Sequence, residues 1–109
     1  MQIDHLLPES SCWNCIPTDR ADGETGFALI KKYKAAGIQI RMIIYSERYL
    51  ADHWCDKGHV LIVQSGELLI EHKNNPERML SAGSLYIVGD DSMPHRLSTA
   101  EGATVYIID

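Results

Sequence analysis

The 109-residue chain lacks any apolar run near the roughly 20 residues that a membrane-spanning helix needs. Its first nine residues also lack the basic-then-apolar order of a signal peptide. Basic residues are few and scattered, since ten Lys and Arg stand against fifteen Asp and Glu, and the formal net charge is -5. Such a surface offers no electrostatic track to phosphates. We therefore expect a soluble, cytoplasmic protein with neither nucleic acid nor membrane as a partner.

Cysteine is scarce, with only three in the chain. An odd number in a reducing compartment indicates free thiols or metal ligands rather than a disulfide framework. Cys12 and Cys15 have the two-residue gap of redox and zinc-knuckle pairs, so they could share a metal or form a reversible disulfide. The chain has no second such pair and no strand-then-helix pattern around this one, so we expect Cys12 and Cys15 to be incidental.

Three common catalytic patterns are also missing from the sequence. It has no Gly-rich phosphate loop and no Ser-His-Asp order. It has no pair of carboxylates placed for glycosidic chemistry. Function therefore has to be sought in other residue types.

What the chain does contain is a series of short runs rich in Ile, Val, Leu and Tyr, each bounded by turn-forming residues. The predicted strands are 27–33, 38–45, 60–64, 67–72, 78–80, 85–88, 95–98 and 104–108. They follow one another too closely for crossover helices, so neighbours should pair antiparallel. Turn residues at Ala36-Gly37, Ser65-Gly66, Asn74-Asn75-Pro76 and Gly89-Asp90-Asp91 mark the boundaries.

The length of the chain and this pattern predict one all-β domain. About eight strands in so short a chain must hide their edges, which favours a β-barrel or a two-sheet jelly roll. We expect residues 26–109 to form the barrel. Residues 1–25 should form an irregular N-terminal arm with at most one edge strand.

Four potential metal ligands have a spacing that chance rarely gives: His53, Cys55, His59 and His95. Residues two apart in an extended segment share a face, so the first three can all point into one barrel interior. His95 begins a later strand that could cross that interior. Imidazole and thiolate ligands suit Zn or Fe, and also Ni, Co or Mn, whereas calcium and magnesium prefer carboxylates.

The same segment resembles the first metal-binding motif of the cupin family. Cys55 stands at the position of the second His of that motif, His59 at the Glu and Gly66 at the Gly. The second cupin motif is resembled by Gly83-Ser84 and Met93-Pro94-His95, with His95 at the metal-binding His and Ser81 where Pro is usual. The resemblance implies a cupin-type β-barrel, also called a double-stranded β-helix or jelly roll.

More narrowly, Asp52-His53-Trp54-Cys55 resembles the small DHCW-motif cupins, together with Gly23-Glu24-Thr25-Gly26 and Pro94-His95-Arg96. The order of Trp54 and Cys55 differs from the letters of that name. This resemblance covers nearly the whole chain and implies a one-domain cupin that binds one metal ion. It implies no particular reaction.

Arg41, Tyr45 and Tyr86 lie on predicted strands beside these motifs. A polar side chain that points inward there could orient a substrate or support a metal ligand. Parity places Arg41, Ile43 and Tyr45 on one face of their strand but does not say which face is internal. His72 lies outside the ligand spacing, and we expect it to face solvent.

Two functions fit this pattern. The first is a metal-dependent enzyme, dioxygenase-like or isomerase-like, in which one divalent transition metal acts on a small polar molecule. The second is a non-catalytic module for metal or small-ligand binding and sensing, in which one Cys and three His ligands close a tetrahedral shell. Either could form a homodimer through a free sheet edge.

Overall fold

The computed structural model describes residues 3–109, which form strands joined by turns and one short 3-10 helix. The strands confirm the all-β prediction. The elements are η1 (Trp13–Cys15), β1 (Asp19–Asp22), β2 (Phe27–Ala35), β3 (Ile38–Tyr45), β4 (Tyr49–Leu50), β5 (His59–His72), β6 (Asn75–Ser81), β7 (Leu85–Val88), β8 (His95–Thr99) and β9 (Ala103–Ile108). None of them is a helix long and apolar enough to cross a membrane.

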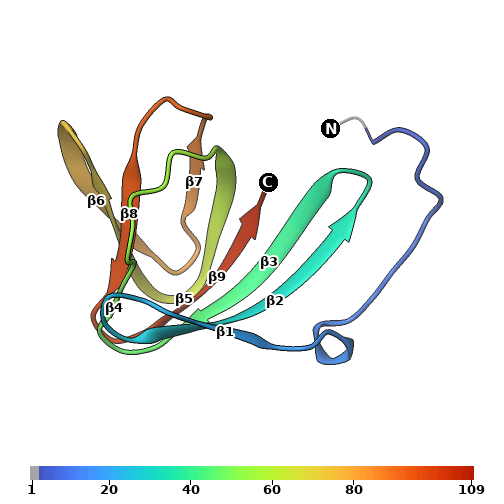
Figure 1. The fold of residues 1–109 in the computed structure, drawn as a ribbon, viewed down its shortest axis with the longest axis horizontal. Helices are drawn as coiled ribbons and strands as arrows, with labels where there is room; N and C mark the ends of the chain where they lie inside the picture. The colour runs from blue at the N-terminus through green and yellow to red at the C-terminus, as the bar shows by residue number, and fades with distance from the viewer. Residues whose placement is uncertain (1–2) are drawn as a thin grey trace.

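All pairs of neighbouring strands are antiparallel, and β5 links two sheets. The first half of β5 pairs with β7 and β9, and beyond β9 the sheet continues through β3 and β2 to β1. The second half of β5 pairs with β6 and β8, and β4 pairs with β8. Figure 1 shows the resulting curl, with the β2–β3 hairpin and the arm before η1 extending away from it.

Strand β5 corrects the prediction of two strands with a turn at Ser65-Gly66. It runs unbroken for 14 residues, with a bulge against β9 between Val63 and Ser65. The extra residue changes which side chains face inward, because Leu61 and Val63 are buried before it and Leu68 and Ile70 after it. Gly66, with φ of +79°, takes a backbone conformation that a side chain would strain. Ser65 and Gly66 therefore bend the strand from one sheet into the other and do not end it.

Other turn predictions are confirmed. Ala36 and Gly37, both with positive φ, connect β2 to β3, and Asn74 with φ of +66° connects β5 to β6. The two-residue strand β4 is too short for an alternating pattern and was not predicted.

The prediction that Cys12 and Cys15 are incidental is wrong, because the structure joins them in a disulfide. The bond closes the turn of η1, where the backbone amide of Cys15 also donates to the carbonyl of Cys12 at 3.0 Å. Trp13 between them packs on Tyr106, with ring centroids 6.1 Å apart. The disulfide therefore stabilises a turn that lies on the outer side of β9.

The core fills the space between the sheets. It consists mainly of alternate residues of β3, β5 and β9, the most buried of which are Leu61, Val63, Leu68, Ile70 and Val105, with single residues from β2, β6 and β7. Ile43 and Tyr45 are also buried, so the face of β3 that carries Arg41, Ile43 and Tyr45 is the internal one. Its other face is partly open, since Ile44 is exposed.

Candidate metal centre

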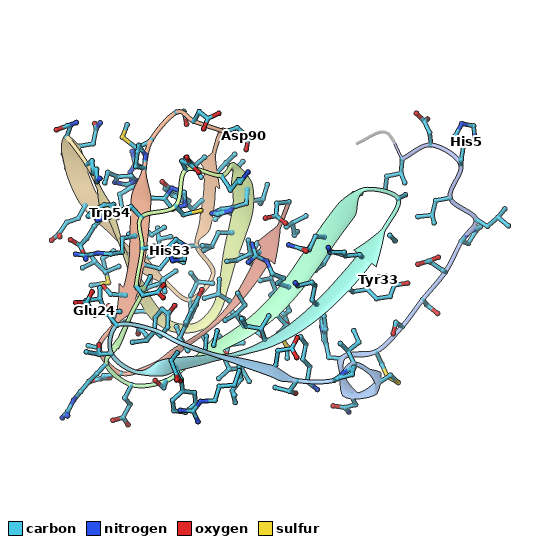
Figure 2. All side chains as sticks on the ribbon, viewed as in Figure 1. His5, Glu24, Tyr33, His53, Trp54 and Asp90 are labelled. Atoms are coloured by element: carbon cyan, nitrogen blue, oxygen red, sulfur yellow. A yellow bond between two sulfur atoms is a disulfide. The ribbon has the colours of Figure 1, made fainter. Side chains whose placement is uncertain are left out.

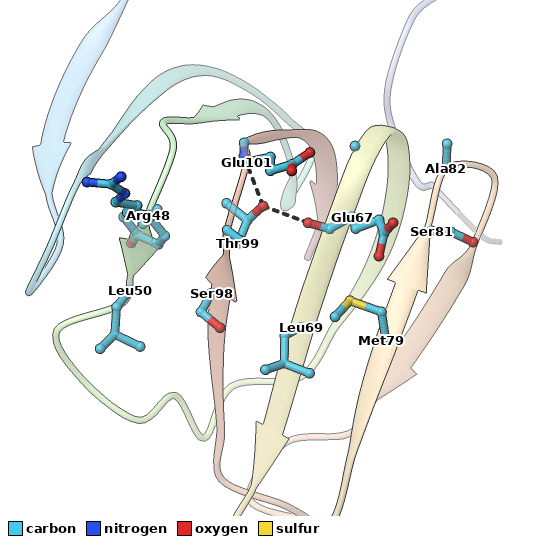
Figure 3. A pocket seen from close by; sticks show the side chains of 14 residues that line it. Arg48, Leu50, Glu67, Leu69, Met79, Ser81, Ala82, Ser98, Thr99 and Glu101 are labelled. Carbon is cyan, nitrogen blue, oxygen red and sulfur yellow. Dashed lines mark hydrogen bonds between the residues drawn. The ribbon is translucent and has the colours of Figure 1, made fainter.

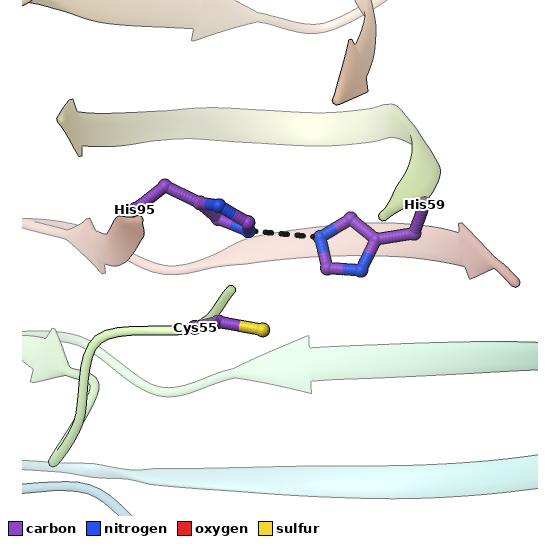
Figure 4. Close-up of side chains that lie close together, drawn as sticks. All are labelled: Cys55, His59 and His95. Carbon is purple, nitrogen blue, oxygen red and sulfur yellow. Dashed lines mark hydrogen bonds between the residues drawn. The ribbon is translucent and has the colours of Figure 1, made fainter. Parts of the chain in front are cut away.

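Three of the four predicted ligands meet inside the barrel. The ligand atoms of Cys55, His59 and His95 all lie within 4.8 Å of one another (Figure 4). Both histidines are buried, and His95 is 1% exposed. The two Nε2 atoms are 3.0 Å apart and the rings are perpendicular. Two nitrogens that each lie about 2.1 Å from one ion would be about 3.0 Å apart at a 90° angle and about 3.4 Å apart at a tetrahedral angle, so the geometry is close to that of ligands of a shared ion.

A backbone pairing brings Cys55 to His95. Each donates its amide to the other's carbonyl, at 2.8 and 2.9 Å, which forms an isolated antiparallel bridge. Side chains of directly opposed residues project to the same face of such a pair. Cys55 therefore points into the barrel beside His95, although no strand forms around it.

His53 lies outside this group. Its side chain is 73% exposed, and its Nδ1 is 2.6 Å from Asp52 Oδ1 (Figure 2). The two-residue parity expected between His53 and Cys55 requires an extended segment, but the chain bends at residues 52–53. The structure thus does not place His53, the fourth ligand that the spacing suggested, with the other three.

The loop that carries Cys55 is held on both sides. On the outside, Trp54 lies under the Arg96 guanidinium, 4.8 Å from the ring centroid, and Arg96 also pairs with Glu71. On the other side, the amide of Gly58 donates to Asp90 Oδ1 at 2.6 Å. These contacts fix the loop before any ion binds, as a preorganised site requires.

His95 and His59 differ in how their second nitrogens are satisfied. His95 Nδ1 is 3.0 Å from the carbonyl of Met93 and can donate to it, which leaves Nε2 as the metal-binding atom. His59 Nδ1 is buried and has no hydrogen-bond partner among residues 3–109. Asp109 Oδ2 lies 3.9 Å away from it.

The pKa of His59 is lowered to about 4. Burial is the largest cause, followed by repulsion from His95 and Arg41. His59 is therefore a neutral imidazole near pH 7, which is the form that binds a metal. The donor set suits a transition metal, because imidazole and thiolate bind Zn and Fe more readily than they bind calcium or magnesium.

A cavity of about 500 Å³ adjoins the group and falls in the size range of small-molecule sites. Its wall includes Cys55 and His59 together with charged and polar side chains and one glycine. These other lining residues are Gln39, Arg41, Lys57, Gly58, Asp90 and Asp109. Arg41 Nη2 donates to Asp109 Oδ2 at 3.0 Å.

Arg41, Tyr86 and Tyr45, which we expected to support the site, lie in different parts of the structure. Arg41 lines the cavity. The Tyr86 ring lies 6.3 Å from that of His95, and its hydroxyl is 2.6 Å from His72 Nε2, so His72 faces Tyr86 and not solvent as expected. Tyr45 packs in the core against Tyr49 and is not among the described residues that line the cavity.

Asp109 was missed by the sequence analysis, although a signal for it exists. It follows the alternating run 104–108, in which Val105 and Ile107 face inward. The same parity places residue 109 on the internal face. The Asp109 side chain is 23% exposed and forms an ion pair with Arg41.

A larger hollow of about 960 Å³ lies on the outer face of the second sheet, between β4 and β6 (Figure 3). Arg48, Leu50, Glu67 and Met79 are among the residues that line it. Its hydrogen bonds hold a turn, since Thr99 Oγ1 donates to the carbonyl of Glu67 at 2.7 Å and accepts from the Gly102 amide at 3.2 Å. The hollow has none of the described Cys or His residues in its wall, so the smaller cavity beside Cys55 and His59 is the better candidate for chemistry.

Comparisons with solved structures agree with this architecture. A cupin-like protein from Thermotoga maritima is 18% identical, covering 83% of this chain and 74% of its own, with a TM-score of 0.71. A cupin-2 domain containing protein from Shewanella frigidimarina is 20% identical, covering 73% of this chain and 78% of its own, with a TM-score of 0.59. Fe(II)-HppE with an alternative substrate is 13% identical, covering 97% of this chain and 60% of its own, with a TM-score of 0.72.

No protein-family model and no curated protein sequence matches the chain. The structural similarities nevertheless show the cupin β-barrel fold that the sequence motifs implied. Fold alone assigns no reaction, so the functional argument rests on the residues of the site.

Proposed function

We propose that this protein is a metal-dependent enzyme of the cupin fold. One transition-metal ion, Zn or Fe, would be held by Cys55, His59 and His95, and a small polar molecule would react in the adjoining cavity. The observation that carries the proposal is the meeting of three buried or half-buried donor residues, two of which, Cys55 and His59, line that cavity. The narrower resemblance to DHCW-motif cupins is part of the same proposal.

Three protein ligands favour an open site. Catalytic zinc sites have three protein ligands and keep a further position for water or substrate, whereas structural sites close with four. The closed alternative would need His53, whose side chain is exposed and turned toward Asp52. This placement favours the enzyme over the closed binding module.

When bound, the ion would supply Lewis acidity or, if it is iron, redox chemistry. The chain's own residues would bind and orient the substrate. Arg41 and Lys57 add positive charge to the wall, which suits an anionic or strongly polar group, while Asp90 and Asp109 can accept hydrogen bonds. The buried imidazoles of His59 and His95 keep water from one side of the reacting centre.

HppE, to which the chain is similar in fold, was solved in an Fe(II) form, so an iron site is one version of the proposal, for which we propose dioxygenase-like chemistry. An isomerase-like reaction on a zinc ion is the other version. In both, the substrate has to fit a cavity of about 500 Å³, which limits it to a small molecule.

The test begins with metal analysis of the protein purified without a histidine tag. We expect one equivalent of a transition metal per chain. The protein is then loaded with Co(II), and azide, cyanide or a small thiol is titrated while the visible spectrum is recorded. An exchangeable position predicts that at least one of these ligands shifts the spectrum.

Two results would contradict the proposal. Protein that neither carries a transition metal nor binds added Co(II) would remove the metal centre altogether. A four-coordinate thiolate spectrum that none of the added ligands perturbs would replace the enzyme with the closed binding module.

A further inference from the structure

The two histidines of the metal group are supported unequally. His95 Nδ1 has the carbonyl of Met93 as its partner at 3.0 Å. His59 Nδ1 is buried without a hydrogen bond to any of the residues that the structure describes. Because buried polar nitrogens nearly always have a partner, this exception needs an explanation.

The tautomers explain it. If the His95 Nδ1–H donates to Met93, then His95 Nε2 is an acceptor, and the 3.0 Å contact requires His59 to donate its Nε2–H. A metal ion on His59 Nε2 takes the place of that proton, so the remaining ring proton has to sit on Nδ1. Metal binding thus turns His59 Nδ1 from an acceptor into a buried donor that needs an acceptor.

Asp109 is placed to be that acceptor. Its Oδ2 lies 3.9 Å from His59 Nδ1, beyond a hydrogen bond but within reach of a small ring rotation. The carboxylate is itself held, since Gln39 Nε2 donates to Oδ1 and Arg41 Nη2 donates to Oδ2, both at 3.0 Å. The backbones of Gln39 and Asp109 are also paired, at 2.7 and 2.9 Å.

We propose that Asp109 is a positioning residue of the metal centre. Its carboxylate accepts the His59 Nδ1–H hydrogen bond when an ion binds Nε2, and so selects the tautomer and the ring orientation that ligation needs. This inference rests on the proposed metal site. Carboxylates that hold metal-bound imidazoles in this way are a common second layer of metal sites.

The charges around the site agree with this role. Arg41 lies close enough to disfavour a positive charge on His59, and Asp109 opposes that effect. Asp109 forms an ion pair with Arg41, and without it the positive charge of Arg41 near a divalent ion would lose the carboxylate that neutralises it. The carboxylate therefore both orients His59 and screens the ion from Arg41.

Asp109→Asn tests the inference, and Asp90→Asn is its matched control. Both variants remove one negative charge from the wall of the same cavity, but of the two residues only Asp109 lies within ion-pair distance of His59 Nδ1. In the control, the asparagine oxygen can still accept from the Gly58 amide, whereas at position 109 a single amide oxygen replaces the two carboxylate oxygens to which Gln39 and Arg41 already donate. Co(II) affinity is measured by competition with a chelator for both variants and the wild type.

We expect Asp109→Asn to lower Co(II) affinity about 10- to 100-fold and Asp90→Asn to lower it much less. Nitrogen-15 NMR of the Zn-loaded wild type supplies an independent readout. It should show a protonated His59 Nδ1 whose proton exchanges slowly with water, and Asp109→Asn should speed that exchange. The wild-type spectrum needs no variant to fold.

Equal affinity losses in the two variants would overturn the inference, because the loss of one negative charge from the cavity wall would then explain both. A zinc-loaded wild type with no protected Nδ1 proton on His59 would overturn it as well. If the wild type binds metal and Asp109→Asn binds it equally well, this inference fails while the proposed function stands. A wild type that binds no metal removes both.

Discussion

Single side chains decide whether an ion can bind here. Burial keeps His59 neutral near pH 7, and the contact of His95 Nδ1 with the Met93 carbonyl leaves the His95 Nε2 lone pair for a ligand bond, while an ion on His59 Nε2 replaces the proton there. Cys55 adds a thiol, which a bound ion deprotonates. His53 is only two residues from Cys55 but faces solvent.

The substitutions His95→Ala and His53→Ala should therefore have opposite outcomes. Loss of His95 removes one of three ligands. Loss of a residue that only supports a ligand lowers metal affinity about 10- to 100-fold, and we expect the loss of His95 to lower it further. Loss of His53 should leave metal content unchanged, because its imidazole lies outside the group. Metal analysis by mass spectrometry after dialysis against a weak chelator measures both variants.

Cys55→Ala should behave like His95→Ala in the same assay. A His53→Ala protein that loses its metal would show that residues 52–53 rearrange when the ion binds and that the site has four ligands. That result would favour the closed module.

The strands and loops position these side chains through contacts between segments that are far apart in the sequence. β5 starts with His59 in one sheet and ends opposite β8 in the other, where His72 pairs with His95. The loop before β5 is tied to the turn after β7, since the Gly58 amide donates to Asp90 and the Asp91 amide donates to the carbonyl of Asp56 at 2.8 Å. The metal group thus depends on how a loop and a turn fit together.

Gly58→Ala tests that fit. A Cβ at Gly58 would lie 2.6 Å from the Asp90 nitrogen and 2.9 Å from the Gly89 carbonyl carbon, so the loop and the turn would have to separate. We expect metal affinity to fall at least about tenfold, because Cys55 and His59 flank the displaced residue. Co(II) competition measures the loss, and circular dichroism checks that the strands remain.

Gly89→Ala is the control for this substitution. A Cβ there would meet only Ser92 Oγ at 3.6 Å and Ser92 Cβ at 3.9 Å, which are ordinary contacts. It should bind metal like the wild type. Similar losses in both variants would mean that the turn, and not the Gly58 contact, controls the site.

The whole molecule is held by a core that also contains tyrosines. Tyr45 is buried against Tyr49, with ring centroids 4.6 Å apart, and burial raises the pKa of the Tyr45 hydroxyl well above its usual value of 10.0. Burial also raises the pKa values of Tyr49 and Tyr86. The folded state therefore holds these protons more tightly than the unfolded state does.

This difference predicts loss of stability in alkali. The contribution of Tyr45 is fully present below about pH 10, the value in the unfolded chain, and is lost as the pH rises above it. The slope for one such group is about 1.4 kcal/mol per pH unit. Tyr45→Phe should lose less free energy of unfolding than the wild type between pH 9 and about pH 11. Urea unfolding of the metal-free proteins at stepped pH measures it, and parallel curves would contradict it.

The sequence by itself determined the strands and the chemistry of the centre. Alternating side chains and turn residues are local signals, so the runs around Ile43, Leu61 and Val105 and the turns at Gly37 and Asn74 could be predicted directly. The motif resemblance likewise pointed to Cys55, His59 and His95 as donors. Donor chemistry belongs to the residue and does not depend on the fold.

Only the tertiary structure decided which residues meet. Parity counts residues along an extended chain, and it fails where the chain bends, as at His53, or gains a residue, as at the bulge in β5. Asp109 lies near His59, 50 positions away in the chain, because the end of β9 pairs with the start of β5, while Gln39 of β3 holds Asp109 from the other side. Such contacts depend on register and on sheet closure, which are set by packing of the whole barrel and not by local sequence.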